Sequence, residues 1–311
     1  MRWIPVAGVV SIVALVAGAA PADKPIPGIG PNGAITRLHT GFKFTEGPAA
    51  DAEGNVYFSD IPNNRIHKVD TSGKLSTFLE NSEGANGLMF DAKGRLLACQ
   101  GRAGRVVAID VKTKEITVLA DQYNGKRFNA PNDLVVDRTG GVYFTDPAFG
   151  KEMAQDKMGV YYIAADGRVT RIIDDLPRPN GVILSPDERT LYVLPSGSPD
   201  VMAYPVEAPG QIGTGRVLCK LAQAKEGKPR GGDGLTVDAK GNLYLTQPAL
   251  SALQVVTPEG KTLGLIRFPE SPANVTFGGK DMKTLYVTAR TSLYTAPMNI
   301  TGHRFATGQV R

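Results

Sequence analysis

The sequence has little of the chemistry on which most metal and nucleophile sites depend. Its 311 residues include only two cysteines and three histidines, and His39, His67 and His303 show no zinc-ligand spacing such as HExxH. GxSxG, P-loop and GxGxxG motifs are missing as well, so nothing supports a serine hydrolase or a nucleotide-binding enzyme. Cys99 and Cys219 could pair in an oxidising compartment, but nothing in the sequence brings them together, and two buried thiols are the favoured interpretation.

An excess of one charge is also missing. Lys and Arg number 35 and Asp and Glu number 30, and both kinds are scattered along the chain rather than gathered in runs. This distribution argues against nucleic acid as a partner.

The chain has one long apolar run, at residues 4–17, and Arg2 precedes it. The run is shorter than the roughly 20 residues that a membrane-spanning helix needs, and the Pro- and Gly-rich stretch after it cannot continue a helix. We therefore expect residues 1–22 to be a cleavable secretory signal peptide, with an uncleaved anchor as the alternative. Residues 23–33 are expected to form a Pro- and Gly-rich N-terminal linker. The mature chain is then periplasmic or secreted, with no membrane span after signal cleavage.

A hairpin-like pattern recurs six times along the rest of the chain. Each copy has a short apolar strand, a turn that opens with Asp and usually contains Gly, and a strand rich in Val, Leu, Tyr and Phe. Asp opens such a turn by bonding its own backbone, and Gly supplies the left-handed residue that closes it. The copies begin at Gly47, Gly87, Asp133, Gly181, Gly234 and Val275.

Further strand-like pieces lie between the copies, so each period can hold four antiparallel strands, the content of one propeller blade. The predicted fold is therefore all-β, a six-bladed β-propeller over residues 34–311 with four antiparallel strands per blade. Closing the blades into a ring removes exposed sheet edges. Residues 34–39 are expected to supply the outer strand of the last blade, beside residues 292–294, and so to fasten the ring.

The residue just before each inner strand carries a side-chain oxygen in all six copies. Because the copies are equivalent, we expect these side chains to converge where the innermost strands line the central channel. Asn-Gly and Asp-Gly are ordinary turn dipeptides, but Glu46 is not a favoured turn residue and stands at the same repeat position. Such a set suits a hard divalent cation, with calcium as the first choice and Mg²⁺, Mn²⁺ or Zn²⁺ as alternatives. The six residues are Glu46, Asn86, Asn132, Asn180, Asp233 and Asn274.

In these motifs the chain resembles the gluconolactonase and senescence-marker-protein family of six-bladed propellers, which includes bacterial drug-responsive lactonases. The resemblance spans nearly the whole mature chain. It is carried by Glu46-Gly-Pro, by residues 58–66, 129–134, 144–147, 179–181, 185–188 and 288–294, and by Asp233-Gly234. Many family members carry Cys-Glu-His where this chain has Cys99-Gln100-Gly101, a departure that bears on specificity for sugar lactones.

The resemblance implies a metal-dependent lactonase whose partner is a small-molecule lactone. It implies metal ligation by Glu46, Asn180 and Asp233, with Asn132 as a fourth ligand or a substrate contact. Asn86 is expected to contact the substrate. Arg127 is suggested to reach substrate oxygens, with a solvated loop arginine as the alternative.

The implied reaction is the opening of a small cyclic ester by water, with the metal polarising the ester carbonyl. Asp233 is the candidate to accept the proton of the attacking water, and Glu46 is the alternative. Two other functions remain open: a metal-dependent phosphotriester or aryl-ester hydrolase that uses the same ring, and a non-catalytic periplasmic module in which the ring is structural. Neither the lactone nor the oligomeric state follows from the sequence.

Overall fold

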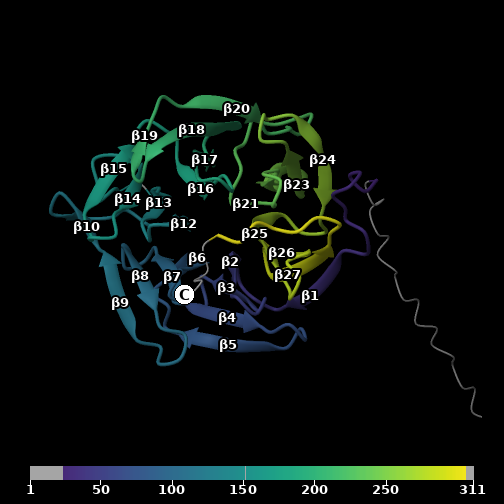
Figure 1. The fold of residues 1–311 in the computed structure, drawn as a ribbon, viewed down its shortest axis with the longest axis horizontal. Coiled ribbons are helices and arrows are strands. Elements are labelled where there is room, and N and C mark those ends of the chain that lie inside the picture. Colours follow the sequence, from purple (N-terminus) through teal and green to yellow (C-terminus); the bar gives the residue numbers. More distant parts are fainter. Residues whose placement is uncertain (1–23, 151, 306–311) are drawn as a thin grey trace, which may run out of the picture.

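The structure is a computed structural model that describes residues 24–150 and 152–305. Six antiparallel sheets stand around a central axis, as Figure 1 shows, and each is one blade. In the first five blades the four main strands follow in chain order from the inside outward. The first blade contains β2 (Thr45–Ala50), β3 (Val56–Asp60), β4 (Arg65–Val69) and β5 (Leu75–Glu80). The second contains β6 (Ala85–Phe90), β7 (Leu96–Gln100), β8 (Arg105–Ile109) and β9 (Ile116–Ala120). The third contains β12 (Leu134–Val136), β13 (Val142–Asp146), β14 (Gly159–Ile163) and β15 (Val169–Ile173).

The other three blades repeat this order with small additions. The fourth contains β16 (Pro179–Leu184), β17 (Thr190–Pro195), β18 (Asp200–Ala208) and β20 (Arg216–Lys220), and the short β19 (Gln211–Ile212) pairs with the end of β18. The fifth contains β21 (Leu235–Val237), β22 (Leu243–Gln247), β23 (Ala252–Val256) and β24 (Thr262–Arg267). The hairpin of β10 (Gln122–Tyr123) and β11 (Lys126–Arg127) lies outside the blades, and Pro248–Leu250 forms a 3-10 turn. The predicted six-bladed propeller is confirmed.

The sixth blade joins the two ends of the ring. It contains β25 (Pro272–Gly278), β26 (Thr284–Ala289), β27 (Ser292–Pro297) and, as its outermost strand, β1 (Thr36–Thr40). Arg37 pairs with Tyr294 and His39 with Leu293, so the predicted fastening strand is confirmed. In Figure 1 the purple β1 lies beside the yellow β27. Antiparallel pairing between these strands leaves no gap in the sixth sheet.

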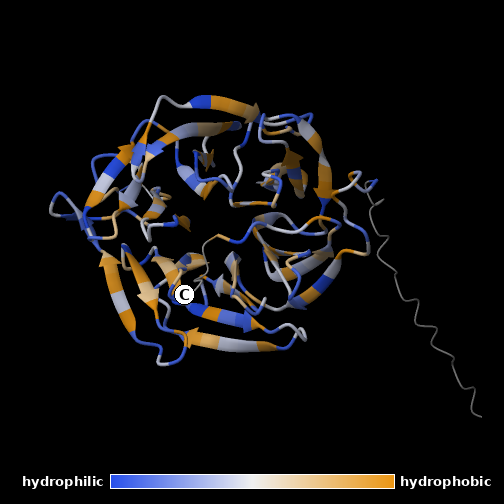
Figure 2. Cartoon of the chain, in the orientation of Figure 1, coloured by the Kyte–Doolittle hydropathy of each residue, from blue (hydrophilic) through white to orange (hydrophobic). Residues whose placement is uncertain are grey.

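The turns of the repeat follow the expected chemistry. Asp51 Oδ1 accepts the backbone N–H of Asn55 at 2.8 Å, and Gly54, at φ +90°, occupies the left-handed position. Asp238 makes the same bond to Asn242 in the fifth blade. Figure 2 places hydrophobic residues mainly in the strands and hydrophilic ones in the connections, and the middle strands of each blade are buried between neighbouring blades. The repeat thus encodes both the hairpins and the core that packs them.

The segment expected to be a linker packs against the ring over the part that the structure describes. Ile26 and Ile29 are buried in the same apolar cluster as Leu253 and Tyr294 of the fifth and sixth blades. The expected signal peptide lies outside the described residues. Among the described residues, no helix is long and apolar enough to cross a membrane. Cys99 and Cys219 are both free thiols.

A buried carboxylate at the end of β3 holds the segment that leads into the first inner strand. Asp60 accepts the backbone N–H groups of Lys43 and Phe44 at 3.1 and 3.2 Å and the carboxamide of Asn63 at 2.6 Å. Replacing Asp60 with Ala leaves the partly buried donors of Phe44 and Asn63 unpaired, so we expect the free energy of unfolding to fall by about 1–3 kcal/mol. Urea denaturation measures this loss. Asp121→Ala, at an exposed site, is the matched control, and equal stability of the two variants would contradict the bracing role.

Candidate active site at one end of the channel

All six inner strands run in the same direction along the axis, so the residues that begin them meet at one end of the channel. A cavity of about 520 Å³ lies there, within the range typical of small-molecule sites. Its lining includes five of the six predicted ring residues: Glu46, Asn86, Asn132, Asn180 and Asp233. The repeat alignment therefore correctly predicted that these side chains come together.

Hydrogen bonds between neighbouring blades hold the ring residues in place. Gly87 N donates to Asn132 O at 2.7 Å, and Gly181 N donates to Asp233 O at 2.9 Å. The blades approach so closely that a Cβ at Gly47 would lie 2.0 Å from Asn86 O. Glycine at position 47 is thus required by this contact as well as by its φ of +47°.

Hydroxyl side chains on the second strand of each of three blades form hydrogen bonds with backbone atoms of the ring residues. Ser59 Oγ donates to Asn86 O at 2.7 Å, and Thr145 Oγ1 donates to Asn180 O at 2.6 Å. In the fifth blade Asp233 N donates to Thr246 Oγ1 at 3.0 Å. These hydroxyls recur at one position of the repeat, on the second strand of the blade, so the sequence contains a signal for them that is separate from the residues before each inner strand.

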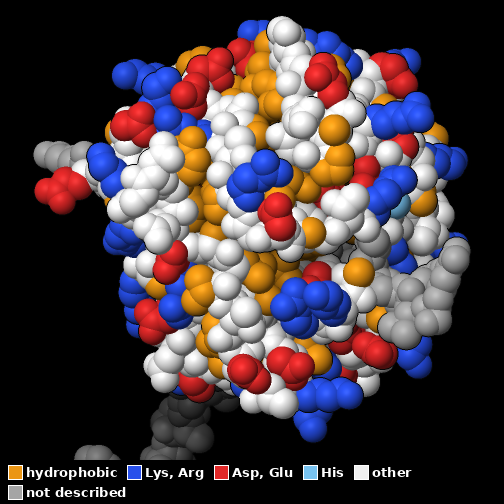
Figure 3. Space-filling model, turned by 60° about the vertical axis from the view of Figure 1, so that its left-hand side comes forward, with side chains coloured by type: hydrophobic (Ala, Val, Ile, Leu, Met, Phe, Trp, Pro, Cys, Tyr) orange, Lys and Arg blue, Asp and Glu red, His pale blue; other side chains and the backbone are white. Residues whose placement is uncertain are grey.

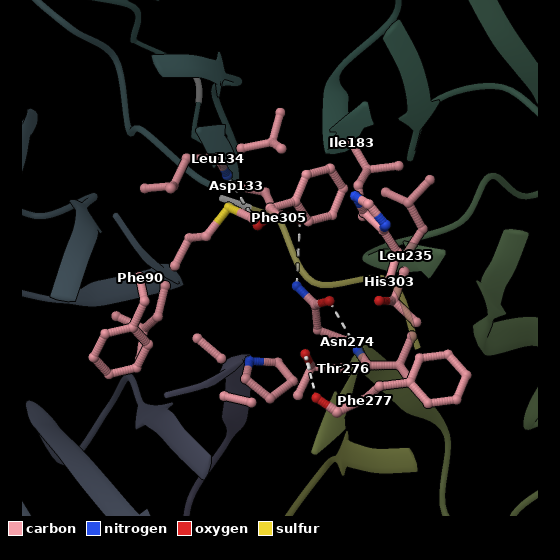
Figure 4. A pocket seen from close by; sticks show the side chains of 18 of the residues that line it. Phe90, Asp133, Leu134, Ile183, Leu235, Asn274, Thr276, Phe277, His303 and Phe305 are labelled. Atoms are coloured by element: carbon pink, nitrogen blue, oxygen red, sulfur yellow. Dashed lines mark hydrogen bonds between the residues drawn. The ribbon is translucent and has the colours of Figure 1, made fainter. Parts of the chain in front are cut away.

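Asn274, the sixth ring residue, lies on the side of the ring that faces a smaller cavity. Beside it lies the carboxylate of Asp133, which the sequence did not predict as a site residue. Both Asn274 and Asp133 line a second, smaller cavity of about 80 Å³ on the other side of the ring, and Figure 4 looks into it. Asp133 Oδ1 accepts its neighbour Leu134 N at 3.0 Å, and Asn274 Nδ2 is 3.4 Å from Asp133 Oδ2. The signal was a departure from the repeat, because Asp133 stands where four of the six copies have glycine.

The carboxylates of Glu46, Asp233 and Asp133 repel one another in a region with little access to water. Burial raises the pKa of Glu46 well above its ordinary value, and the charges of Asp233 and Asp133 raise it further, against a hydrogen bond from Gly47 N. Burial also raises the pKa of Asp233 to about 7, with Asp133 adding to the rise and the Asn180 side chain opposing it. Burial alone raises the pKa of Asp133 to about 7. A cation placed among them would relieve this cost.

The ring offers oxygen donors but no site made of acids alone. In the part of the chain that the structure describes, no group of three or more His, Cys, Asp and Glu side chains is close enough to hold a metal. Carboxamide oxygens must therefore complete any ligand set. Asn86 Oδ1 is buried at the cavity and has no hydrogen-bond partner among the described residues. Carboxylates combined with neutral carboxamide oxygens are the donor set that calcium accepts.

Arg127 is not among the residues that line this cavity. It lies on the exposed β11 and donates through Nη2 to Arg102 O at 3.1 Å. Two other arginines, Arg102 and Arg178, line the cavity instead, together with the apolar side chains of Phe44, Ile61 and Phe149. Arg127 thus lies outside the cavity lining, as its alternative of a solvated loop arginine expects, whereas Arg102 and Arg178, which no motif had singled out, belong to the lining.

The C-terminal segment lies across the other end of the channel. Gly302 N donates to Met282 O of the sixth blade, and His303 N donates to Val237 O of the fifth. His303, Arg304 and Phe305 line the smaller cavity with residues from all six inner strands, and Phe305 lies near the middle of that ring of side chains in Figure 4. The C-terminal segment therefore covers the end of the axis opposite the larger cavity.

The comparisons with known proteins agree with this architecture. The chain is 34% identical to a gluconolactonase of Zymomonas mobilis over 288 residues, which covers 82% of this chain and 78% of that protein. A solved gluconolactonase structure from Xanthomonas campestris superposes with a TM-score of 0.78 at 28% identity and covers 85% of this chain and 89% of that one. The calcium-binding protein regucalcin from Agrobacterium tumefaciens shares the fold, with a TM-score of 0.75 at 22% identity over 89% of this chain and 97% of its own.

Residues 44–291 match the profile of the SMP-30/gluconolactonase/LRE-like region. The match begins two residues before Glu46 and ends in the last blade, so it contains all six inner strands and every residue of the ring. With its six blades, its ring of oxygen side chains and this match, the chain belongs to the SMP-30/gluconolactonase/LRE-like family.

Proposed function

We propose that this protein is a calcium-dependent lactonase that opens a small cyclic ester with water. The observation that carries the proposal is the large axial cavity, whose floor gathers two carboxylates and three carboxamides from five different blades. The gluconolactonases of Zymomonas mobilis and Xanthomonas campestris support the substrate class. A plugged mouth at this end would have favoured a non-catalytic module, whereas an open cavity at the ring favours an enzyme.

Calcium fits the residues present. Glu46, Asn180 and Asp233 would hold the ion, with Asn132 as a fourth ligand, and the unpartnered Asn86 Oδ1 leaves one more oxygen facing the same space. When bound, the cation supplies Lewis-acid stabilisation of the negative charge that develops on the ester carbonyl oxygen. The calcium-binding regucalcin, which shares the fold, supports the choice of ion.

Asp233 is the proposed acceptor of the proton from the attacking water. Glu46 is the less suitable of the two acids, because its Oε2 already accepts Gly47 N at 2.8 Å. Among the described residues, no backbone N–H donates to the Asp233 carboxylate, which instead interacts with the Asn180 side chain. A carboxylate oxygen that accepts fewer hydrogen bonds is more available to a water proton. The apolar side chains of Phe44 and Ile61 help to exclude bulk water from the same cavity.

We also propose that the protein is exported. The signal-like N-terminus supports this location. Extracellular calcium modules bind their ion with Kd values of about 0.1–1 mM, so even a weak calcium site would serve outside the cell.

The test is hydrolysis of a panel of lactones, an aryl ester and one phosphotriester by the mature chain, before and after removal of metal by a chelator. We expect turnover of at least one lactone, loss of that turnover on chelation, and recovery when calcium is added back. Turnover of only the phosphotriester or the aryl ester would overturn the substrate class. Lactone turnover that survives complete chelation would overturn the role of calcium.

A further inference from the structure

The walls of the active-site cavity carry two arginines for which the proposed reaction has no use. Arg102 follows β7, and Arg178 precedes β16, so they come from the second and fourth blades. Both line the same cavity as the carboxylates of Glu46 and Asp233. The floor of the cavity is therefore acidic, while its walls bear positive charge.

Neither arginine is neutralised by the protein. Within residues 24–150 and 152–305, neither Arg102 nor Arg178 forms an ion pair with a carboxylate. Other arginines are paired, as in Arg65–Glu80, Arg95–Asp91, Arg138–Glu188 and Arg171–Asp156. Two unpaired guanidinium groups on the walls of one cavity are suited to a ligand that brings its own negative charge.

The backbone holds Arg178 in an unfavourable conformation. Its φ is +58°, in the left-handed region, and it lies between Pro177 and Pro179. Its carbonyl oxygen accepts Ser196 N at 2.9 Å and Ser196 Oγ at 3.3 Å, which fixes the strained residue two positions before Asn180. Strain of this kind at a non-glycine residue is concentrated at functional sites.

The positions of both arginines are also supported by neighbouring groups. The Arg178 guanidinium lies 5.8 Å from the centre of the Phe149 ring, and Phe149 also lines the cavity. Arg102 O accepts Arg127 Nη2, and Gly101 N donates to Gly84 O at 3.1 Å, so the loop that carries Arg102 is tied down on both sides. A guanidinium that lies over an aromatic ring keeps the N–H donors at its edge available to an anion.

We propose that the preferred substrate is a lactone with an anionic substituent, such as a carboxylate, remote from the ester carbonyl. The inference rests on the proposed lactonase function. The ester end lies over the acidic floor, and Arg102 and Arg178 bind the anionic end through charge-assisted hydrogen bonds. The cavity volume of about 520 Å³ leaves room for a six-carbon lactone and its substituent.

The experiment compares the γ-lactones of gluconic and glucaric acid, which differ only in a terminal CH₂OH group or carboxylate. We expect kcat/KM of the wild type to be about tenfold higher for the anionic lactone, mainly through KM. Arg178→Gln and Arg102→Gln should each reduce this ratio, and the double variant should abolish it. The ratio should also shrink as ionic strength rises. Arg216→Gln, at an exposed position on β20, is the matched control and should keep the wild-type ratio.

Two outcomes overturn the inference and leave the lactonase function intact: equal kcat/KM for the two lactones in the wild type, or a ratio that the double variant does not change. If neither lactone is hydrolysed, the wider lactone panel still decides the proposed function, and calorimetric binding of glucarate and gluconate decides the inference. Tighter binding of glucarate that the double variant loses supports it, and equal binding overturns it. Melting curves confirm that each variant is folded.

Discussion

Asp233→Asn is expected to lower kcat/KM for lactone hydrolysis by about a thousandfold, the range of effect of a lost general base. Asp233 and Glu46 are the two carboxylates that line the larger cavity, and Glu46 has one oxygen engaged by Gly47 N. The substitution keeps the shape of the side chain and removes its ability to accept a proton. Steady-state kinetics on a lactone identified from the panel measures the loss.

Glu46→Gln separates proton transfer from metal binding. If Glu46 serves mainly as a ligand, its variant should regain part of the lost activity at raised calcium, whereas Asp233→Asn should not. Asp121→Asn, at an exposed site away from the cavity lining, is the control and should behave as the wild type. An Asp233→Asn variant within a few fold of wild-type activity would show that another group accepts the proton.

Calcium is expected to raise the melting temperature of the metal-free protein by about 10 °C. A ligand at 100 to 1,000 times its Kd stabilises the folded state by about 3–4 kcal/mol, and each kcal/mol shifts a domain of this size by about 2–4 °C. The charge of Asp133 lies close enough to raise the pKa of both Glu46 and Asp233, so the metal-free site is electrostatically unfavourable. Differential scanning calorimetry with and without chelator measures the shift.

Asp133→Asn tests the cause of this stabilisation. Removal of the third charge should raise the melting temperature of the metal-free protein and reduce the further rise that calcium produces, because less repulsion remains to be relieved. Asp166→Asn, in an exposed turn, is the control and should leave both values unchanged. The electrostatic explanation would be wrong if Asp133→Asn lowered the metal-free melting temperature and kept the full calcium shift.

The sequence predicted most of the fold because each blade is a copy of one local pattern. Turn residues such as Asp51 and Gly54 act within a few positions of the chain, and the repeat places equivalent residues at equivalent sites. The same logic located five of the six ring residues in one cavity. It also brought Asn274 to the axis, where its side chain hydrogen-bonds to Glu46 and lies beside Asp133, although Asn274 lines the smaller cavity instead of the larger one.

The features that the sequence did not predict depend on contacts between distant segments. Arg102 and Arg178 belong to loops of different blades, and only the closed ring brings them to one cavity. Arg127 lies in a similar loop, but the β10–β11 hairpin carries it to the exposed surface. The even distribution of charge could be predicted from the sequence. On the face drawn in Figure 3, acidic and basic side chains are interspersed and not separated by sign. Loop geometry, unlike charge balance, has no local signature.

The C-terminal segment affects how substrate enters the ring and how product leaves it. Because His303, Arg304 and Phe305 lie across one end of the axis, we expect substrate and product to use the other end, where the larger cavity lies. Under the proposed function, the hydroxy acid formed at the floor must depart by the route along which the next lactone arrives. Occupancy by one excludes entry of the other, so the enzyme slows as its own product accumulates, and flux depends on how quickly the surroundings remove that acid.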